Sequence, residues 1–300
     1  MNSHRIRKGS LMQARDLEWG WSDSPILLPL AYQPREWNAA FIAMHIAEYS
    51  GSQLIVYHVS LATESASAEF REEVRSLAEK LRVKVSFVEE KAEDGSFDSI
   101  SRMIVTQAMK QNAQAIIMPA HKEGFFKELV GRVSDRVAQR NPMKTVLVET
   151  PDPKIKITSS PRKIAVLVKP GTEPKDAFIV AAALTSLATT PDAELLAAQA
   201  ILLPQTVPLD AMEYSNEIRL MERRFAETIS SVIKNLGRMF SPRILASRQL
   251  GKDIADFVLK EKVDILILTG HRRNLISGLF GTDTKEIVGN APCVSLIVFS

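Results

Sequence analysis

The sequence carries the same pattern twice, once in each half. An apolar run leads into a polar loop with a histidine, then a glycine, then a proline, and then a second apolar run. Three pairs of residues are each separated by 150 positions: His121 and His271, Gly131 and Gly281, and Pro142 and Pro292. A repeat of this length exceeds the roughly 20–50 residues of solenoid units, so it predicts two copies of one domain.

The chain of 300 residues is long enough for two compact domains, each with its own core. Prolines between the two copies exclude both helix and interior strand there, which predicts a linker. We therefore expect an N-terminal tail or membrane-proximal linker at 1–24, domain 1 at 25–150, a linker at 151–161 and domain 2 at 162–300.

The segment 1–24 matches neither copy. It combines basic residues with Trp19 and Trp21. Cationic and aromatic residues suit docking on a membrane surface or on a partner helix. The other interpretation is a flexible tail whose two tryptophans pack on domain 1.

Charge and cysteine content exclude several classes of protein. The net charge of +3 is spread over both halves, which argues against nucleic acid as a partner. A single cysteine, Cys293, excludes an intramolecular disulfide and any multi-cysteine metal site, and favours the cytoplasm. The longest apolar stretch, at 177–187, is shorter than the roughly 20 residues that cross a bilayer, so we expect no transmembrane span and no metal site.

Apolar runs alternate with helical patterns throughout. The first half reads as strands near 26–31, 54–59 and 83–88, a fourth that starts at Ala115 and runs into the next loop, and a fifth at 145–148, with helices between them; the second half restarts at 163–169. This alternation predicts an α/β fold with parallel sheets and right-handed crossovers, arranged as two five-stranded, Rossmann-like units with pseudo-twofold symmetry.

The second half contains an insertion of about 12 residues relative to the first, because Leu167 lies 138 positions after its counterpart Pro29 while later pairs are 150 apart. The insertion falls in a helical pattern predicted over 209–240. Its apolar positions are Met212, Ile218, Met221, Phe225, Ile229, Val232, Leu236 and Met239. Such a face is usually core; the alternative is that the extra turns contact a partner.

Ligands of parallel sheets bind at the carboxyl ends of strands, where the strand order reverses. The candidate sites are therefore the loops after Ala31 and Lys169, and the loops that begin at Pro119 and Thr269.

The chain resembles the universal stress protein family as a tandem pair over nearly all of 25–300. The resemblance is carried by the segments Ile26-Leu27-Leu28-Pro29-Leu30, Tyr57-His58-Val59, Val263 to His271 and Asn290-Ala291-Pro292-Cys293. In the ATP-binding branch of that family, an aspartate ends the first strand, and the loop after the fourth strand carries two glycines and then Gly-Ser/Thr. Glycines let the backbone approach phosphates, and the helix N-terminus attracts them.

In the first copy, the resemblance implies that the nucleotide site is lost. Ala31 stands at the aspartate position, and the loop glycines are replaced by Pro119, which has no N–H donor, and Lys122. Gly131 is present, but Arg132 follows it in place of a hydroxyl residue.

The second copy departs less from the family pattern. Lys169 stands at the aspartate position, and Arg272 and Arg273 replace the second glycine. The candidate residues for a nucleotide or anion site are Lys169, Thr269, Gly270, Arg272, Arg273, Gly281 and Thr282. Arginines bind phosphate well. The alternative is an exposed basic loop in which Thr282 or Asp283 caps the next helix.

No mechanism-bearing motif accompanies these loops, so we expect no catalytic residue. His121 and His271 favour a loop-stabilising role over metal or acid-base chemistry, His58 reads as a core or rim histidine, and Cys293 as an inert buried thiol.

Two functional hypotheses follow from the resemblance. The first is a non-enzymatic cytosolic regulatory or dimerisation module with nucleotide binding lost or weak, similar to cytosolic portions of transporters such as amino-acid permeases, cation-proton antiporters and cation-chloride cotransporters. The second is a stand-alone universal stress protein that binds ATP or another adenine nucleotide in domain 2.

The two fifth strands, at 146–148 and 296–298, are apolar edges that would aggregate if left open. We expect them to be covered, either by each other or by a second chain. We further expect a pseudo-twofold monomer that forms a homodimer through the fifth-strand edges, alongside a transporter segment or a regulatory protein as partner.

Overall fold

The computed structural model describes residues 21–60, 67–120, 133–169, 174–186, 193–203, 212–234, 236, 238–270 and 282–300. The first half contains β1 (Ile26–Pro29), η2 (Pro34–Glu36), α1 (Trp37–Ser50), β2 (Leu54–Ser60), α2 (Ala68–Leu81), β3 (Val85–Lys91), α3 (Phe97–Lys110), β4 (Ala115–Ala120), α4 (Val133–Arg140) and β5 (Lys144–Glu149). The second half contains β6 (Lys163–Leu167), α5 (Lys175–Ser186), β7 (Glu194–Leu202), α6 (Met212–Ile233), β8 (Ser241–Ser247), α7 (Leu250–Glu261), β9 (Ile265–Thr269), α8 (Thr282–Asn290) and β10 (Val294–Phe299).

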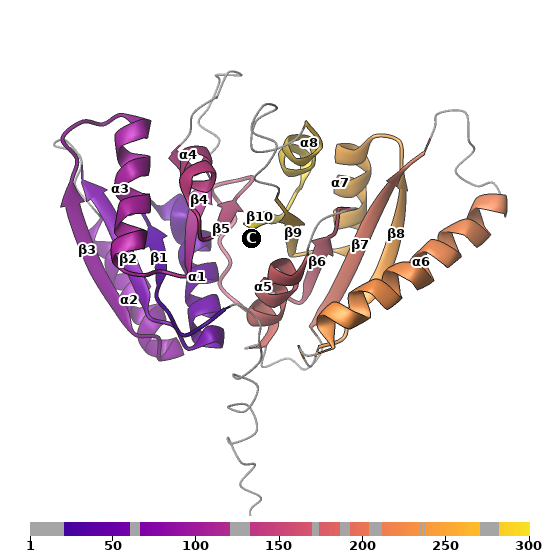
Figure 1. The fold of residues 1–300 in the computed structure, drawn as a ribbon, viewed down its shortest axis with the longest axis horizontal. Coiled ribbons are helices and arrows are strands. Elements are labelled where there is room, and N and C mark those ends of the chain that lie inside the picture. The colour runs from indigo at the N-terminus through magenta and orange to yellow at the C-terminus, as the bar shows by residue number, and fades with distance from the viewer. Residues whose placement is uncertain are drawn as a thin grey trace, which may run out of the picture.

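The strands form one continuous sheet in the order β3-β2-β1-β4-β5-β10-β9-β6-β7-β8. All pairings within each half are parallel, whereas β5 and β10 pair antiparallel in the middle (Figure 1). The predicted α/β fold with two parallel, five-stranded units is confirmed, and the order of strands in one half mirrors that in the other.

The two fifth strands cover each other. Leu147 lies opposite Ile297 and Val148 opposite Leu296 in the antiparallel pair. The expectation that these edges need a cover is met within one chain. The expected homodimer through the same edges is therefore wrong, because their backbone groups already bond to each other and leave no edge for a second copy.

Helices cover both faces of the sheet. Along β1, Ile26 and Leu28 pack with α1, α2, α5 and α6 in one core, and Leu27 packs in the other core, which holds side chains of α3, α4, α7 and α8. Successive residues of a strand point to opposite faces, so an uninterrupted apolar run serves both cores at once. Complete burial of such a side chain contributes about 1.5–3 kcal/mol.

Local signals set the helix ends. The Ser67 side chain accepts a hydrogen bond from the Phe70 N–H at 3.3 Å and caps α2, and Ser96 caps α3 in the same way from Ser99 at 3.2 Å. Helix α1 ends at Gly51, which adopts φ 71°, a left-handed conformation that costs glycine little.

The helix predicted over 209–240 is too long. Helix α6 ends at Ile233, and Met239, which the pattern assigned to its apolar face, is 92% exposed. The core face itself is correct in the middle of the helix, where Phe225 and Ile229 are buried. Beyond Ile233 the chain is no longer helical, although Leu236 still packs against the core and Phe240 is buried in it.

The linker lies against α1. The Trp37 indole N–H donates to the Ile157 carbonyl at 2.7 Å, and the Asn38 amide donates to the Ile155 carbonyl at 2.8 Å while its oxygen accepts from the Ile157 N–H at 2.8 Å. These bonds satisfy backbone groups in a segment whose prolines prevent regular structure.

A second connection joins the halves. The Trp21 indole N–H donates to Asp176 Oδ1 on α5 at 2.8 Å, and Lys144 Nζ of β5 lies 3.3 Å from the same oxygen. Asp176 is buried. Trp21 therefore packs on the folded chain, as the tail interpretation expects, but its hydrogen-bond acceptor, Asp176, belongs to the second half and not to domain 1. Trp19 lies outside the described residues.

Candidate functional site

The carboxyl ends of β6, β7 and β9 lie together at one edge of the second half, beside α7 and α8 (Figure 1). From β6 the chain passes to β7 on one side, and it later returns through β9 on the other. This reversal of strand order is where open parallel sheets bind ligands. Because Leu167 pairs with Leu268, Thr269 at the end of β9 and Lys169, two residues after β6, lie at neighbouring strand ends.

Lys169 spans the gap between β6 and α8. The Val168 N–H donates to the Ala198 carbonyl at 2.8 Å, which holds the end of β6 against β7. From there Lys169 Nζ donates to Thr284 Oγ1, in the first turn of α8, at 2.5 Å. Burial lowers the pKa of the Lys169 ammonium group, and the nearby Asp283 carboxylate partly offsets that effect. The lysine thus places a partly desolvated positive charge at the strand ends.

A cavity of about 410 Å³ lies beside this lysine. It is lined by Leu167, Val168, Lys169, Ala200, Ile201, Leu202, Leu250, Asp283 and Ile287. Its size is in the range of small-molecule sites, and a mostly apolar wall with a few polar groups is their usual composition. The cavity therefore joins an apolar wall to one ammonium and one carboxylate group.

Gly270 has a packing role in this structure. Its N–H donates to the Val298 carbonyl at 2.8 Å, and a Cβ atom at this position would lie 2.5 Å from Cε1 of the buried Phe299 ring. The preceding Thr269 ends β9 and is buried. The close approach of the ring thus explains why a glycine stands here without any phosphate.

The structure brings together only part of the predicted site. Lys169, Thr269, Gly270 and the first turn of α8 meet at one edge of the sheet, and Thr282 is the first residue of that helix. Arg272, Arg273 and Gly281 lie outside the described residues, as do both loop histidines, His121 and His271.

The corresponding edge of the first half is filled by the chain's own side chains. Glu36 Oε2 accepts from the Ala31 N–H at 2.8 Å, so a carboxylate from η2 holds the turn. Tyr32 adopts φ 57° and lies 4.8 Å from the His58 ring, centroid to centroid. The His58 Nδ1 atom is 2.8 Å from the Leu30 carbonyl oxygen, and His58 is buried, which confirms it as a core histidine.

Sequence reasoning missed Glu36 and Tyr32 because neither belongs to the repeat. A carboxylate seven residues after the end of β1 was the available signal for Glu36. Pro119, predicted as a loop residue, is instead within β4 and pairs with Val148. The loop that follows, with Lys122, Gly131 and Arg132, lies outside the described residues.

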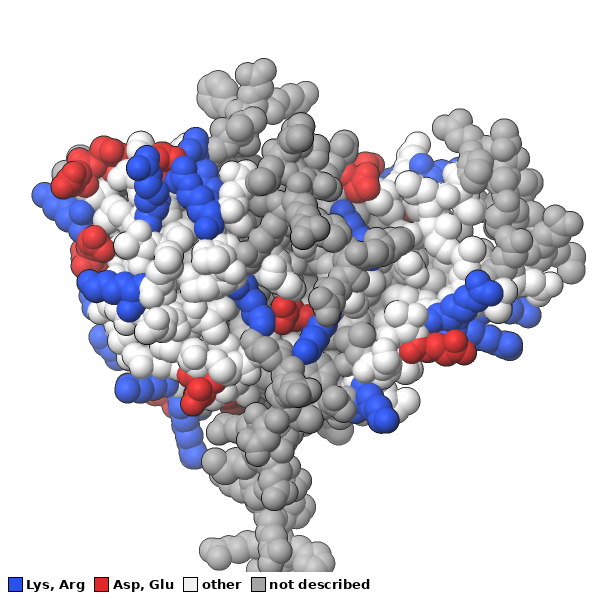
Figure 2. Space-filling view, in the orientation of Figure 1, with Lys and Arg blue, Asp and Glu red and all other residues white. Residues whose placement is uncertain are grey.

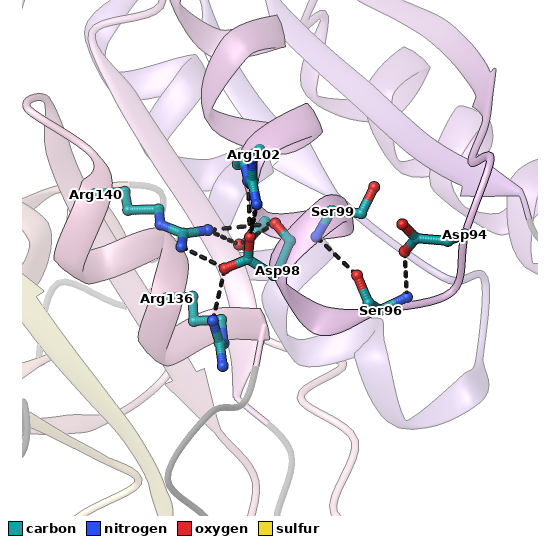
Figure 3. Close-up of polar contacts among 8 residues, drawn as sticks. Asp94, Ser96, Asp98, Ser99, Arg102, Arg136 and Arg140 are labelled. Atoms are coloured by element: carbon teal, nitrogen blue, oxygen red, sulfur yellow. Dashed lines mark hydrogen bonds and ion pairs between the residues drawn. The ribbon is translucent and has the colours of Figure 1, made fainter.

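A separate polar cluster joins α3 to α4 (Figure 3). Asp98 Oδ1 accepts from Arg136 Nη1 at 2.7 Å and from Arg140, and Asp98 Oδ2 accepts from Arg102 Nε at 2.8 Å. Hydrogen bonds from Arg140 and then Arg102 lower the pKa of the Asp98 carboxyl to about 2. Nothing in the sequence repeat pointed to this cluster.

We interpret this cluster as a set of structural ion pairs that hold α3 against α4. The adjacent cavity, about 420 Å³, is lined by Glu90, Asp94, Ser96, Asp98, Ser99, Arg102, Met103, Thr106, Gln107 and Lys110. It is lined by three carboxylates and two basic groups, and one of those carboxylates, Asp98, is already paired with arginines. Acidic and basic side chains are also interspersed over the face of the molecule in Figure 2, with basic ones gathered over α3 and α4.

Cys293 is buried, and burial raises the pKa of its thiol to about 12. A thiol that stays protonated is a poor nucleophile and metal ligand. Within the described part of the chain, no group of three or more His, Cys, Asp or Glu side chains is placed to hold a metal ion. Within the same residues, no helix combines the length and apolar character needed to cross a bilayer.

Comparison with known proteins gives the family of the first half. The model of the universal stress protein family matches residues 24–149. These residues are therefore similar to a universal stress protein domain. No curated protein matches the sequence.

The universal stress protein fold extends over both halves. A putative universal stress protein from Pseudomonas aeruginosa UCBPP-PA14 superposes with a TM-score of 0.60 at 16% identity, covering 94% of this chain and 95% of that one. A universal stress protein from Archaeoglobus fulgidus DSM 4304 gives 0.56 at 12% identity, with 93% and 97% covered. The cytoplasmic domain of a prokaryotic cation chloride cotransporter gives 0.54 at 10% identity, with 93% and 95% covered.

Proposed function

We propose that this chain is a non-enzymatic tandem universal-stress-type module that acts as a regulatory domain in the cytosol, with nucleotide binding lost or weak. The observation that carries the proposal is the position of Lys169. The family's ATP-binding branch has an aspartate there, and this chain has an ammonium group bonded to Thr284 at 2.5 Å. An opposite charge at this point changes which ligand the site favours.

The first half supports the same proposal. Its strand-end turn is held by Glu36, and the aromatic ring of Tyr32 is 97% buried against its neighbours, with 3% exposed. A ligand would have to displace that ring, which forms part of a hydrophobic core. Displacement of a packed aromatic side chain costs several kcal/mol, on the order of 3–5. We therefore assign the first half a structural role.

We propose that the module is attached to a membrane transporter. The cytoplasmic domain of a prokaryotic cation chloride cotransporter shares the tandem arrangement over 95% of its length, which supports this choice. Amino-acid permeases and cation-proton antiporters are the other transporter classes considered. An antiparallel β5–β10 pair within one chain means that dimerisation, if it is part of the function, uses a different surface; the outer strands β3 and β8 end the sheet.

The second candidate function is a stand-alone universal stress protein that binds ATP or another adenine nucleotide in its second half. The cavity of about 410 Å³ beside Lys169 is the observation that favours it. The two candidates differ in what they predict for Mg-ATP and in where the native protein is found.

Two measurements separate the candidates. Isothermal titration of the purified chain with Mg-ATP is expected to give no saturable heat, and incubation with ATP no hydrolysis. Antibodies against the chain are expected to detect the native protein in salt-washed membranes of the source cells. Micromolar ATP binding together with detection only in the soluble fraction would establish the stand-alone alternative.

A further inference from the structure

The cavity beside Lys169 is built for a ligand with two different ends. Seven of its lining residues are apolar: Leu167, Val168, Ala200, Ile201, Leu202, Leu250 and Ile287. Of the two ionisable ones, Lys169 lies two residues after the end of β6 and Asp283 lies in the first turn of α8. A ligand in this cavity would therefore contact apolar side chains of β7 and α7 as well as the two charged groups.

The rim of the cavity exposes apolar surface. Leu202, the last residue of β7, is 62% exposed although it lines the cavity. Next to it along the strand, Ile201 is only partly buried, and Leu250 at the start of α7 is partly buried as well. An occupant with an apolar body would remove this surface from water, which is favourable by roughly 25 cal/mol for each Å² covered.

The charged end favours an anion. Lys169 Nζ bonds to Thr284 Oγ1, and its desolvation strengthens its attraction for a negative group. The backbone of the first turn of α8 adds the positive end of a helix dipole beside it. Asp283 opposes both, so the balance admits one anionic group and does not favour the several charges of a polyphosphate.

We propose that this cavity binds a small amphipathic anion, with its anionic head on Lys169 and its apolar body against Ile201, Leu202 and Leu250. The head is a carboxylate or a phosphate monoester, because an ammonium group binds either one. The inference rests on the proposed loss of nucleotide binding and names the class of ligand that a regulatory module of this kind would sense.

The test uses the full chain with methyl-labelled Ile, Leu and Val and two probes, octanoate and hexyl phosphate, followed by NMR. At least one probe is expected to shift the methyl signals of Ile201, Leu202 and Leu250 saturably, with a Kd of about 1 mM or tighter. The neutral probe octan-1-ol is expected to bind at least tenfold more weakly, since it lacks the negative charge that Lys169 attracts. A tenfold loss is about the effect of removing one charged hydrogen bond.

Substitutions at the head of the site decide the role of the lysine. Lys169→Met is expected to weaken probe binding about tenfold or more, and Lys169→Arg to keep it within about threefold. Lys252→Met, on the exposed side of α7 and away from the cavity lining, is the matched control and is expected to bind as the unaltered chain does. Thermal melting without ligand shows whether each variant is folded.

Three results would overturn the inference: no saturable shift with either charged probe, equal binding by folded Lys169→Met, or shifts confined to methyl groups elsewhere. A separate arm with Mg-ATP tells the two proposals apart. Absence of binding by both ATP and the charged probes defeats this inference and leaves the proposed function standing. ATP binding in the micromolar range defeats the proposed function and the inference with it.

Discussion

Gly270 lies directly against the ring of Phe299, so close that a Cβ atom at position 270 would be 2.5 Å from Cε1 of the ring. The ring is fully buried at the end of β10. This contact gives a residue of the loop that the sequence predicts to bind phosphate a second, structural reason to be glycine. It also makes the two reasons separable by experiment.

Gly270→Ala is expected to destabilise the fold by about 1–3 kcal/mol, because the added methyl group overpacks the Phe299 site. The free energy of unfolding from urea denaturation measures the effect. Gly289→Ala is the matched control, since nothing lies within 4 Å of a Cβ atom there and the residue is within α8. That control is expected to be neutral or stabilising by up to about 1 kcal/mol. Equal effects of the two substitutions would contradict the packing role.

The β5–β10 seam is expected to be essential for stability. Leu296 is completely buried opposite Val148, so Leu296→Lys places a charge in the core beside the seam and is expected to cost more than about 3 kcal/mol or to prevent folding. Met239→Lys is the control, because Met239 is 92% exposed. Its effect is expected to stay within about 0.5 kcal/mol. A large loss of unfolding free energy in Met239→Lys would instead support the longer helix that the sequence pattern predicted.

The Asp98 cluster is expected to stabilise the packing of α3 on α4 in a pH-dependent way. Hydrogen bonds from Arg140 and Arg102 lower the pKa of the Asp98 carboxyl from 3.8 to about 2, so the contribution is complete above pH 3.8 and is lost as the pH falls towards 2. Asp98→Asn is expected to lower the urea midpoint at neutral pH. Its difference from the unaltered chain is expected to shrink between pH 3.8 and about 2.

Glu72→Gln is the control for that series, because Glu72 and Arg75 form an exposed pair three residues apart on α2. Exposed pairs contribute little, so this midpoint is expected to match that of the unaltered chain at every pH. A constant deficit of Asp98→Asn at all pH values would show that the variant acts through packing and not through the ionised carboxylate.

The contact between Trp21 and Asp176 is expected to hold the two halves together. Trp21→Phe keeps the aromatic ring but removes the indole N–H that donates to Asp176 Oδ1 at 2.8 Å. Loss of a hydrogen bond to a buried carboxylate is expected to cost about 1.5–3 kcal/mol, less whatever Lys144 recovers. The free energy of unfolding measures it, with the exposed Lys154→Met as control. No change in Trp21→Phe would mean that the bond is not maintained in solution.

The sequence is most informative where one residue pattern allows one structure. Apolar runs such as Leu54 to Val59 are strands because they are buried on both faces, and the repeat of the fourth and fifth strands reveals the tandem units. The end of α6 and the start of β8 are not predictable in this way. Near Met239 the apolar spacing is helical by chance. Pro242 argues against a strand in the sequence, but β8 is at the edge of the sheet, where proline is tolerated.

The site is harder to predict than the fold because its members interact over long sequence distances. Sequence comparison places Lys169 at the end of β6, yet only the fold brings it to Thr284, 115 positions later. Glu36 and Tyr32 fill the first half's strand-end turn through local geometry that no repeat records. Likewise, Arg136 and Arg140 reach Asp98 only because α3 packs on α4.

Lys169→Asp is expected to move the second half back towards nucleotide binding, since it restores the carboxylate that the family's ATP-binding branch has at this position. Any saturable heat with Mg-ATP in this variant, absent from the unaltered chain, would support the assignment of the loss to this residue. Equal behaviour of the two proteins would place the cause in the glycine positions of the loop instead.

Our central proposal is that the chain keeps a universal-stress-type scaffold in which the groups that bind phosphate have been replaced. Isothermal titration of the unaltered full chain with Mg-ATP tests it most directly. We predict no saturable heat at millimolar ATP. A stoichiometric transition with a micromolar Kd, lost when Lys169 or the end of the adjacent cavity is altered, would contradict it.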